Sequence, residues 1–145
     1  ISDKEKLKKI VSQTFFHSDA LLKENSRKPT AMMIVMGMWV ESINISARLC
    51  KGDPEYNHEL AKSIVEQGLV FDDLMGMLNG LGNSPDVAHI KAELDPLRNS
   101  YAAMNASLGG SYVSADGSSV AYDKELFQSI CKSVTDARDN FTQLF

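Results

Sequence analysis

Glu41 has the side chain whose type and position most suggest chemistry. It lies in the middle of a predicted helix among apolar neighbours, where a carboxylate must be paired, hydrogen-bonded or protonated. Asn44 and Arg48 follow at i+3 and i+7, on the same face of that helix. We interpret this group first as a structural polar network that fixes the register of neighbouring helices. Catalysis is not expected, because no nucleophile or second carboxylate accompanies Glu41 on its helix.

The alternative interpretation is a pocket for a small ligand. Helix levels counted across the predicted bundle place Tyr101 near Glu41, with Arg98 as a further neighbour. The candidate ligand-binding residues are Trp39, Glu41, Asn44, Arg48 and Tyr101. The network and the pocket both stay open as hypotheses at this point.

A metal centre is not expected. Glu55 and His58 match the Glu-x-x-His spacing of di-iron bundles once, and Asp86 with His89 approximates it. Both pairs fall in the first turn of their helices, which are predicted to run antiparallel. The pairs would then lie roughly 30 Å apart, at about 1.5 Å per residue, and could not share a metal pair. We therefore expect no metal ligands and no cofactor.

Cysteine and histidine spacing gives no catalytic signal either. Cys50 and Cys131 lie far apart in the sequence, which excludes a zinc ribbon and a thioredoxin-type motif. We expect two free thiols, with a single disulfide as the alternative in an oxidising compartment. The three histidines form no Ser/His/Asp or Cys/His arrangement that can be recognised.

The elements that must position these residues are helices. The chain has 145 residues, 43% of them hydrophobic and 23% charged, which is typical of one globular domain over residues 1–145. Helical periodicity with start and stop signals predicts five helices, and the short links between them predict an all-α, antiparallel up-and-down bundle. The predicted helices cover residues 3–25, 30–51, 53–78, 85–108 and 123–144. Pro96 should kink or split the fourth helix near Asp95.

Two of these helices carry specific packing expectations. The first should turn an apolar stripe toward the core, including Leu7, Ile10, Val11 and Phe15. The second is apolar nearly all round, which is typical of the central, most buried helix of a bundle. Counting residues along the second and third helices away from the turn between them places Gly37 opposite Gly68. We expect the two backbones to approach closely there.

Residues 111–121 are the one patterned stretch that is not predicted to be helical. Asp116-Gly117 between two short runs is typical of a two-residue type I′ turn, and Val113 would pair with Val120. A lone hairpin is marginal unless it packs on something. We expect either a short β-hairpin against the end of the bundle or a mobile loop.

Charge is unevenly distributed along the chain. The formal net charge is −4, made up of +4 over residues 1–52, −7 over 53–95 and −1 over 96–145. This balance argues against nucleic-acid binding, which usually needs a basic face. The acidic segment 53–95 could pack beside the basic first helix, or it could dock a basic protein partner. No run of about 18 uninterrupted apolar residues is present, so we expect no membrane-spanning segment.

Two stretches resemble a known group of proteins. Residues 36–45, Met-Gly-Met-Trp-Val-Glu-Ser-Ile-Asn-Ile, resemble a Gly-x-Trp-[Ile/Val]-Glu-[Gly/Ser]-Leu pattern, with Asn44 where an apolar or aromatic residue is usual. The tail from Tyr112 through Asp116-Gly117 to 136–139, Asp-Ala-Arg-Asp, resembles a hairpin followed by a helix. Both are similar to uncharacterised helical-bundle envelope lipoproteins of Bacteroidetes-type bacteria. The resemblance covers about a third of the chain.

The resemblance implies an exported precursor with a lipidated N-terminus, in the bacterial periplasm or envelope, and no known enzymatic activity. The chain begins at Ile1 without an initiator Met, which we interpret as processing or trimming. Our leading hypothesis is a non-enzymatic structural or protein-interaction domain of the envelope. The alternative is a small-molecule sensing or binding domain with its pocket near Trp39, Glu41 and Tyr101. The sequence does not indicate an oligomeric state.

Overall fold

Five helices make up a computed structural model of the chain, which describes residues 2–24, 28–113 and 120–143. They are α1 (Asp3–Glu24), α2 (Lys28–Cys50), α3 (His58–Asn79), α4 (Pro85–Ser107) and α5 (Lys124–Gln143). No strand occurs within the described residues. The prediction of an all-α chain with five helices is therefore confirmed.

Side-chain caps fix where most of the helices begin. Ser2 and Glu5 form a reciprocal capping box at the start of α1, with each backbone nitrogen 3.3 Å from the other residue's side-chain oxygen. Ser84 Oγ accepts from the Val87 N–H at the start of α4, and Asp123 Oδ1 accepts from the Leu126 N–H at the start of α5. These short-range signals were readable in the sequence.

The third helix begins later than predicted. Asp53 does not cap it, because its Oδ1 accepts from the Glu55 N–H at 2.9 Å in a local turn. Asn57 is the cap instead and accepts from the Leu60 N–H, so that α3 starts at His58. Of the two outcomes predicted at Pro96, the split is wrong, because α4 continues through Pro96 to Ser107. The kink stays a prediction.

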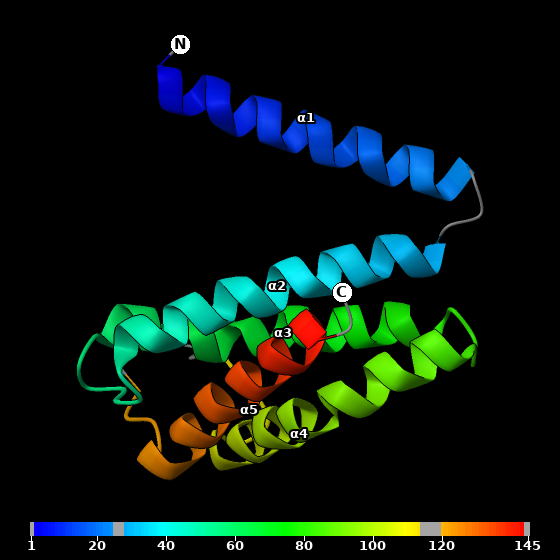
Figure 1. Cartoon of the computed structure of the whole chain (residues 1–145). Helices are drawn as coiled ribbons and strands as arrows, with labels where there is room; N and C mark the ends of the chain where they lie inside the picture. The colour runs from blue at the N-terminus through cyan, green and yellow to red at the C-terminus, as the bar shows by residue number, and fades with distance from the viewer. Residues whose placement is uncertain (1, 25–27, 114–119, 144–145) are drawn as a thin grey trace.

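Four helices, α2 to α5, pack around one apolar core (Figure 1). The closest packing joins α5 to α4 and to α2, while α3 lies against α2 and α4. The largest fully buried side chains come from all four helices: Met36, Val40, Ile64, Val65, Phe71, Leu78, Leu94, Leu97, Tyr101, Met104, Phe127 and Ile130.

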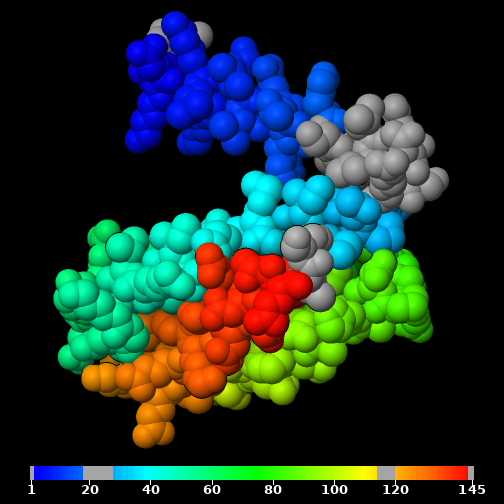
Figure 2. All heavy atoms as spheres, viewed as in Figure 1, coloured from blue at the N-terminus to red at the C-terminus, as the bar shows by residue number. Residues whose placement is uncertain are grey.

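α1 stands apart from this core over most of its length (Figures 1 and 2). Its neighbour is α2. Leu7, Ile10, Val11 and Phe15 were expected to face the core, but Leu7 is 61% exposed and Phe15, the least exposed of them, is still 40% exposed. The burial predicted for this stripe is therefore wrong, because α1 diverges from α2 instead of lying along it.

α2 is central but only half covered. It contacts α1, α3, α4 and α5, yet its outer side exposes Ile34, Met38, Ile45 and Leu49. By length and composition α2 is also the one helix among the described residues that could cross a membrane. A core helix passes the same test, and part of α2 is buried against its neighbours. The absence of a membrane span stays a prediction.

Two local expectations meet different outcomes. The turn expected at Asp116-Gly117 lies outside the described residues, since 114–119 are not among them. The close approach of Gly37 to Gly68 is wrong: a Cβ on Gly37 would meet nothing within 4 Å. Gly68 is instead approached by the ring of Tyr112, to which a Cβ there would come within 2.6 Å. The small residue at 68 makes room for a side chain, not for a second backbone.

Candidate functional site

A groove beside Trp39 is shared by several helices. Its volume is about 440 Å³, and it lies between the middle of α2, the adjoining side of α3 and one residue of α1. Trp39 Nε1 donates a hydrogen bond of 2.9 Å to Gln67 Oε1, which ties the α2 wall to the α3 wall. The lining residues are Phe15, Val35, Met38, Trp39, Ser42, Ile43, Ser46, Ser63 and Gln67.

A stack of aromatic rings packs against Trp39 on the core side of the groove. The Trp39 ring lies 5.2 Å from that of Phe71, and Phe71 lies 5.6 Å from Tyr101, with small interplanar angles. Tyr112 meets Tyr101 edge-on at 5.9 Å. Such pairs contribute beyond the area they bury. Trp39 is therefore held by a rigid column of rings that reaches from α2 through α3 to α4.

The two tyrosine hydroxyls in this column serve structure. Tyr101 Oη donates to the Ile64 carbonyl oxygen at 2.8 Å, and Tyr112 Oη donates to the Tyr101 carbonyl oxygen at 3.1 Å. Burial raises the pKa of Tyr101 far above its ordinary value, and the nearby Cys131 and Tyr112 raise it further. Tyr101 is thus a neutral hydrogen-bond donor at every ordinary pH, satisfied by the backbone and turned away from any ligand.

The structure brings together only two of the five predicted site residues. Trp39 and Tyr101 are neighbours, with ring centroids 6.3 Å apart. Glu41 does not approach Tyr101. Its Oε2 accepts a hydrogen bond of 3.0 Å from Arg138 Nε, on α5. Arg98, the other expected neighbour of Glu41, lies 3.0 Å from Asp95.

The remaining two residues also point elsewhere. Asn44 is buried, and its Oδ1 accepts from Thr135 Oγ1 at 3.0 Å, again on α5. Arg48 is exposed. The predicted face of Glu41, Asn44 and Arg48 therefore contacts α5 or solvent rather than the Trp39 groove. Glu41 is not an interior acid, since its side chain is 44% exposed. A polar network that ties helices together does exist, but its partner is α5.

Sequence reasoning missed the polar wall of the groove. Gln67 and Ser63 line it from α3, and Phe15 closes it from α1. The level arithmetic for the second and third helices, with facing positions summing to about 105, places Trp39 almost opposite Gln67. The sequence therefore contained a signal for the contact between Trp39 and Gln67, but our expectation concerned only Gly37 and Gly68.

Metal and thiol chemistry find little support in the described residues. Across 2–24, 28–113 and 120–143, no cluster of three or more His, Cys, Asp or Glu side chains could hold a metal ion. Cys50 and Cys131 are free thiols, the first buried and the second partly buried. Burial, with a smaller contribution from Cys50, raises the pKa of Cys131 to about 12. Such a thiol is a poor nucleophile at neutral pH.

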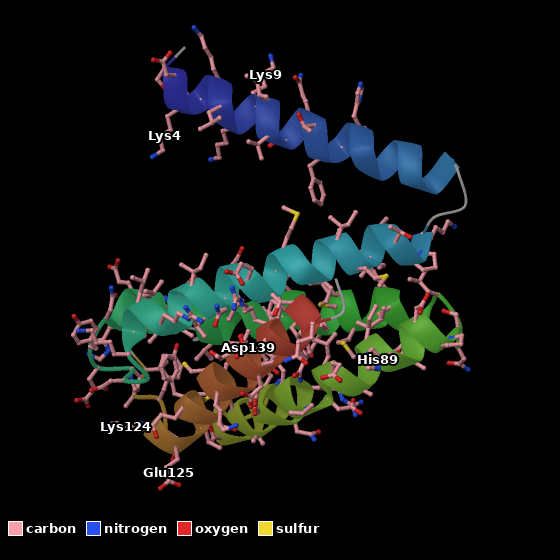
Figure 3. All side chains as sticks on the ribbon, viewed as in Figure 1. Lys4, Lys9, His89, Lys124, Glu125 and Asp139 are labelled. Carbon is pink, nitrogen blue, oxygen red and sulfur yellow. The ribbon has the colours of Figure 1, made fainter. Side chains whose placement is uncertain are left out.

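A second candidate surface is apolar. We call it the α1–α2 apolar face. Its members are Leu7, Ile10, Val11 and Phe15 on α1 and Ile34, Met38, Ile45 and Leu49 on α2, all at least 40% exposed. Figure 3 shows Lys4 on the side of α1 that is turned toward the bundle and Lys9 on the opposite side. Leu7 and Val11 follow Lys4 at i+3 and i+7, so the stripe faces α2 across an open wedge.

The wedge is closed at one point. Phe15 and Met38 line the same groove, which places these two side chains near each other between α1 and α2. Toward the N-terminus of α1 the two helices separate (Figure 2). A further hollow among residues 10–17 is lined, within the described part of the chain, by α1 alone and is open surface.

Comparisons of the chain with protein-family models, curated proteins and solved structures return no match.

Proposed function

We propose that this chain is a non-enzymatic protein-interaction domain whose contact surface is the α1–α2 apolar face. One observation carries the proposal: eight large apolar side chains lie exposed on two facing helices while a complete core sits beneath them. Monomeric proteins rarely leave large contiguous apolar patches to water, and such patches mark interaction sites. The resemblance to envelope lipoproteins supports a place in the bacterial envelope. The short links between helices support an antiparallel arrangement of the bundle.

A photo-reactive amino acid placed at Ile10 tests this proposal. Ile10 belongs to the apolar face, whereas Gln13 lies a turn further on and outside the stripe, and both are exposed. In the cells that make the protein, irradiation should yield a discrete cross-linked species from position 10 and not from position 13. Mass spectrometry then identifies the species as a second copy or another protein. Equal background labelling from both positions would refute the proposal.

The acidic segment 53–95 is proposed as a second contact region, for a basic partner. Asp72 and Asp73 are adjacent exposed acids on α3. Burial, and the charge of Asp73, raise the pKa of Asp72 above its ordinary value. A cationic partner would relieve this repulsion, which supports attraction of basic protein surfaces. Binding through this region should weaken as salt is raised, because exposed charges are screened.

The groove beside Trp39 supports a second candidate function, the binding of a small molecule. Its volume falls within the range of about 300–1,000 Å³ typical of ligand pockets. Apolar walls with Gln67 and three serines give it a mixed lining. Trp39 is the single tryptophan, so its fluorescence reports on the groove directly.

A metabolite screen that follows Trp39 emission tests this candidate. A true ligand should give a saturable change that Gln67→Leu weakens, since Gln67 supplies the polar contact beside the indole. Glu41→Gln is the matched control, because Glu41 contacts Arg138 outside the groove. A response that both variants lose equally, or no saturable response to any compound, would count against the pocket.

A further inference from the structure

Both sides of the wedge between α1 and α2 carry apolar side chains at helical spacing. On α1, Leu7, Val11 and Thr14 recur at intervals of four and three residues, as in the seam of a coiled coil. On α2, Ile34, Met38, Ile45 and Leu49 lie on one face, with the half-exposed Glu41 between Met38 and Ile45. Each seam therefore has the spacing that another amphipathic helix needs.

The α1 stripe is also broader than contact with one helix requires. At about 100° per residue, it extends from Ile10 to Phe15 over roughly 140° of the helix circumference. A seam for a single partner is narrower than this. A helix with so wide an apolar side is suited to packing against two helices at once. Within the described residues, α2 is the helix that α1 mainly packs against, and Phe15 is the residue of α1 that lines the groove shared with α2.

We infer that two copies of this chain pair through α1, with the α1 of each copy inserted into the wedge between α1 and α2 of the other. The contact is isologous: each copy contributes the same stripe and the same wedge around a two-fold axis. The result is a four-helix layer made of two α1 helices and two α2 helices. This inference rests on the proposed function, since it names the partner of the α1–α2 apolar face.

The area available is sufficient for a stable dimer. From the exposed fractions of its eight members, with aromatic and long aliphatic side chains presenting on the order of 170 Å² each, the face offers about 750 Å² per copy. Two copies would then bury roughly 1,500 Å², within the range of about 1,200–2,000 Å² for specific interfaces. One copy folding α1 down on its own α2 would leave part of the broad stripe uncovered.

Charge favours the same pairing. Residues 1–52 carry a net charge of +4, with Lys4, Lys6, Lys8 and Lys9 in the first turns of α1. α3, which lies beside α2, carries four acids against one lysine: Glu59, Glu66, Asp72 and Asp73 against Lys62. An α1 helix from a second copy therefore approaches an acidic flank, and the approach is attractive.

The test is the mass of the intact chain in solution, measured by light scattering over a series of concentrations. Dimers near twice 16.0 kDa are expected. Val11→Lys and Ile45→Lys should each weaken the dimer roughly a hundred-fold, because a charge would be buried in the apolar seam. Gln13→Lys adds the same charge to α1 outside the stripe and should leave the dimer intact. Circular dichroism should show the same helix content in all three variants, since none of these residues belongs to the core.

Two results would overturn the inference. The first is a monomer mass at every concentration, which is what an α1 that closes on its own chain would give. The second is a dimer that Gln13→Lys weakens as much as Val11→Lys does. Neither result alone refutes the proposed function, because photo-cross-links from Ile10 to a different protein would still identify the α1–α2 apolar face as a contact surface.

Discussion

Both sides of α2 carry large apolar residues, but in opposite environments. Met36, Val40 and Ile43 face the core and are at most 5% exposed, whereas Met38 and Ile45 on the outer side are each 51% exposed. The inner side is covered by α3, α4 and α5, whereas on the outer side the neighbouring helix, α1, is separated from α2 over most of its length. The apolar residues of α2 would allow either side to be buried. Which side is buried depends on where the neighbouring helices pack.

The same contrast separates the two clusters of aromatic and aliphatic residues. In the core, rings stack on rings, and the hydroxyls of the two buried tyrosines, Tyr101 and Tyr112, each have a backbone acceptor. On the α1–α2 apolar face, side chains of the same types have water as their neighbour. The core should therefore account for folding stability and the outer face for association, and the two functions should respond to different substitutions.

The largest effect should come from removing a ring from the core. Phe71→Ala removes a fully buried ring that stacks on both Trp39 and Tyr101, and should cost about 3–5 kcal/mol of unfolding free energy. Phe16→Ala is the matched control, since Phe16 is 73% exposed, and should change stability by less than about 0.5 kcal/mol. Urea unfolding measures both. Similar losses for the two variants would break the distinction between core and outer face.

Glycine substitutions should act in opposite directions on α2 and α3. Gly68→Ala drives a Cβ into the ring of Tyr112, which is buried and hydrogen-bonded to Tyr101, and should cost about 1–3 kcal/mol. Gly37→Ala meets no atom within 4 Å and should instead stabilise the helix by up to about 1 kcal/mol. Thermal melts of the two variants should therefore shift to opposite sides of the parent. A shared direction would contradict the geometry described for Tyr112.

Polar pairs between α2 and α5 should differ according to burial. Thr135→Val removes the donor to the buried Asn44 and should cost about 1–3 kcal/mol. Glu41→Gln weakens the half-exposed pair with Arg138 and should cost clearly less than Thr135→Val, because solvent screens an exposed ion pair. Chemical denaturation with added salt separates them further, since only the ion pair is screened. If the loss of unfolding free energy in Glu41→Gln were the same at low and high salt, the result would argue against this ranking.

Alkaline pH should weaken the core gradually. The pKa of Cys131 is raised to about 12, so the folded chain holds a proton that the unfolded chain releases near pH 9. Its contribution is fully present below about pH 9 and is lost as pH rises toward 12; Tyr101 acts in the same sense above about pH 10. Between about pH 8 and 10 the unfolding free energy should fall by on the order of 1 kcal/mol. Cys131→Ala should show a smaller fall, and an unchanged slope in that variant would rule out the assignment.

Part of the candidate site could be predicted from residue types and spacing. Trp39 and Tyr101 are neighbours as expected, because both sit at core levels that helix geometry fixes. The neighbours expected for Glu41, Tyr101 and Arg98, were wrong, since its true contact is Arg138. Arg138, and the Thr135 that contacts Asn44, lie more than 90 residues further along the chain. No local sequence pattern specifies how two helices so far apart in the chain are rotated about their axes relative to each other. A small change in that rotation moves a residue from the core to the surface.

The sequence by itself determined five helices, the caps of Ser2, Ser84 and Asp123, and an apolar character for α2 on every side. These features depend on hydrogen bonds and periodicity within a few residues of each other. Only the tertiary structure decided that α1 stands away from the bundle and that Glu41 belongs with Arg138. An amphipathic helix carries the requirement for an apolar neighbour in its own residues, but which helix supplies that neighbour depends on packing across the whole molecule.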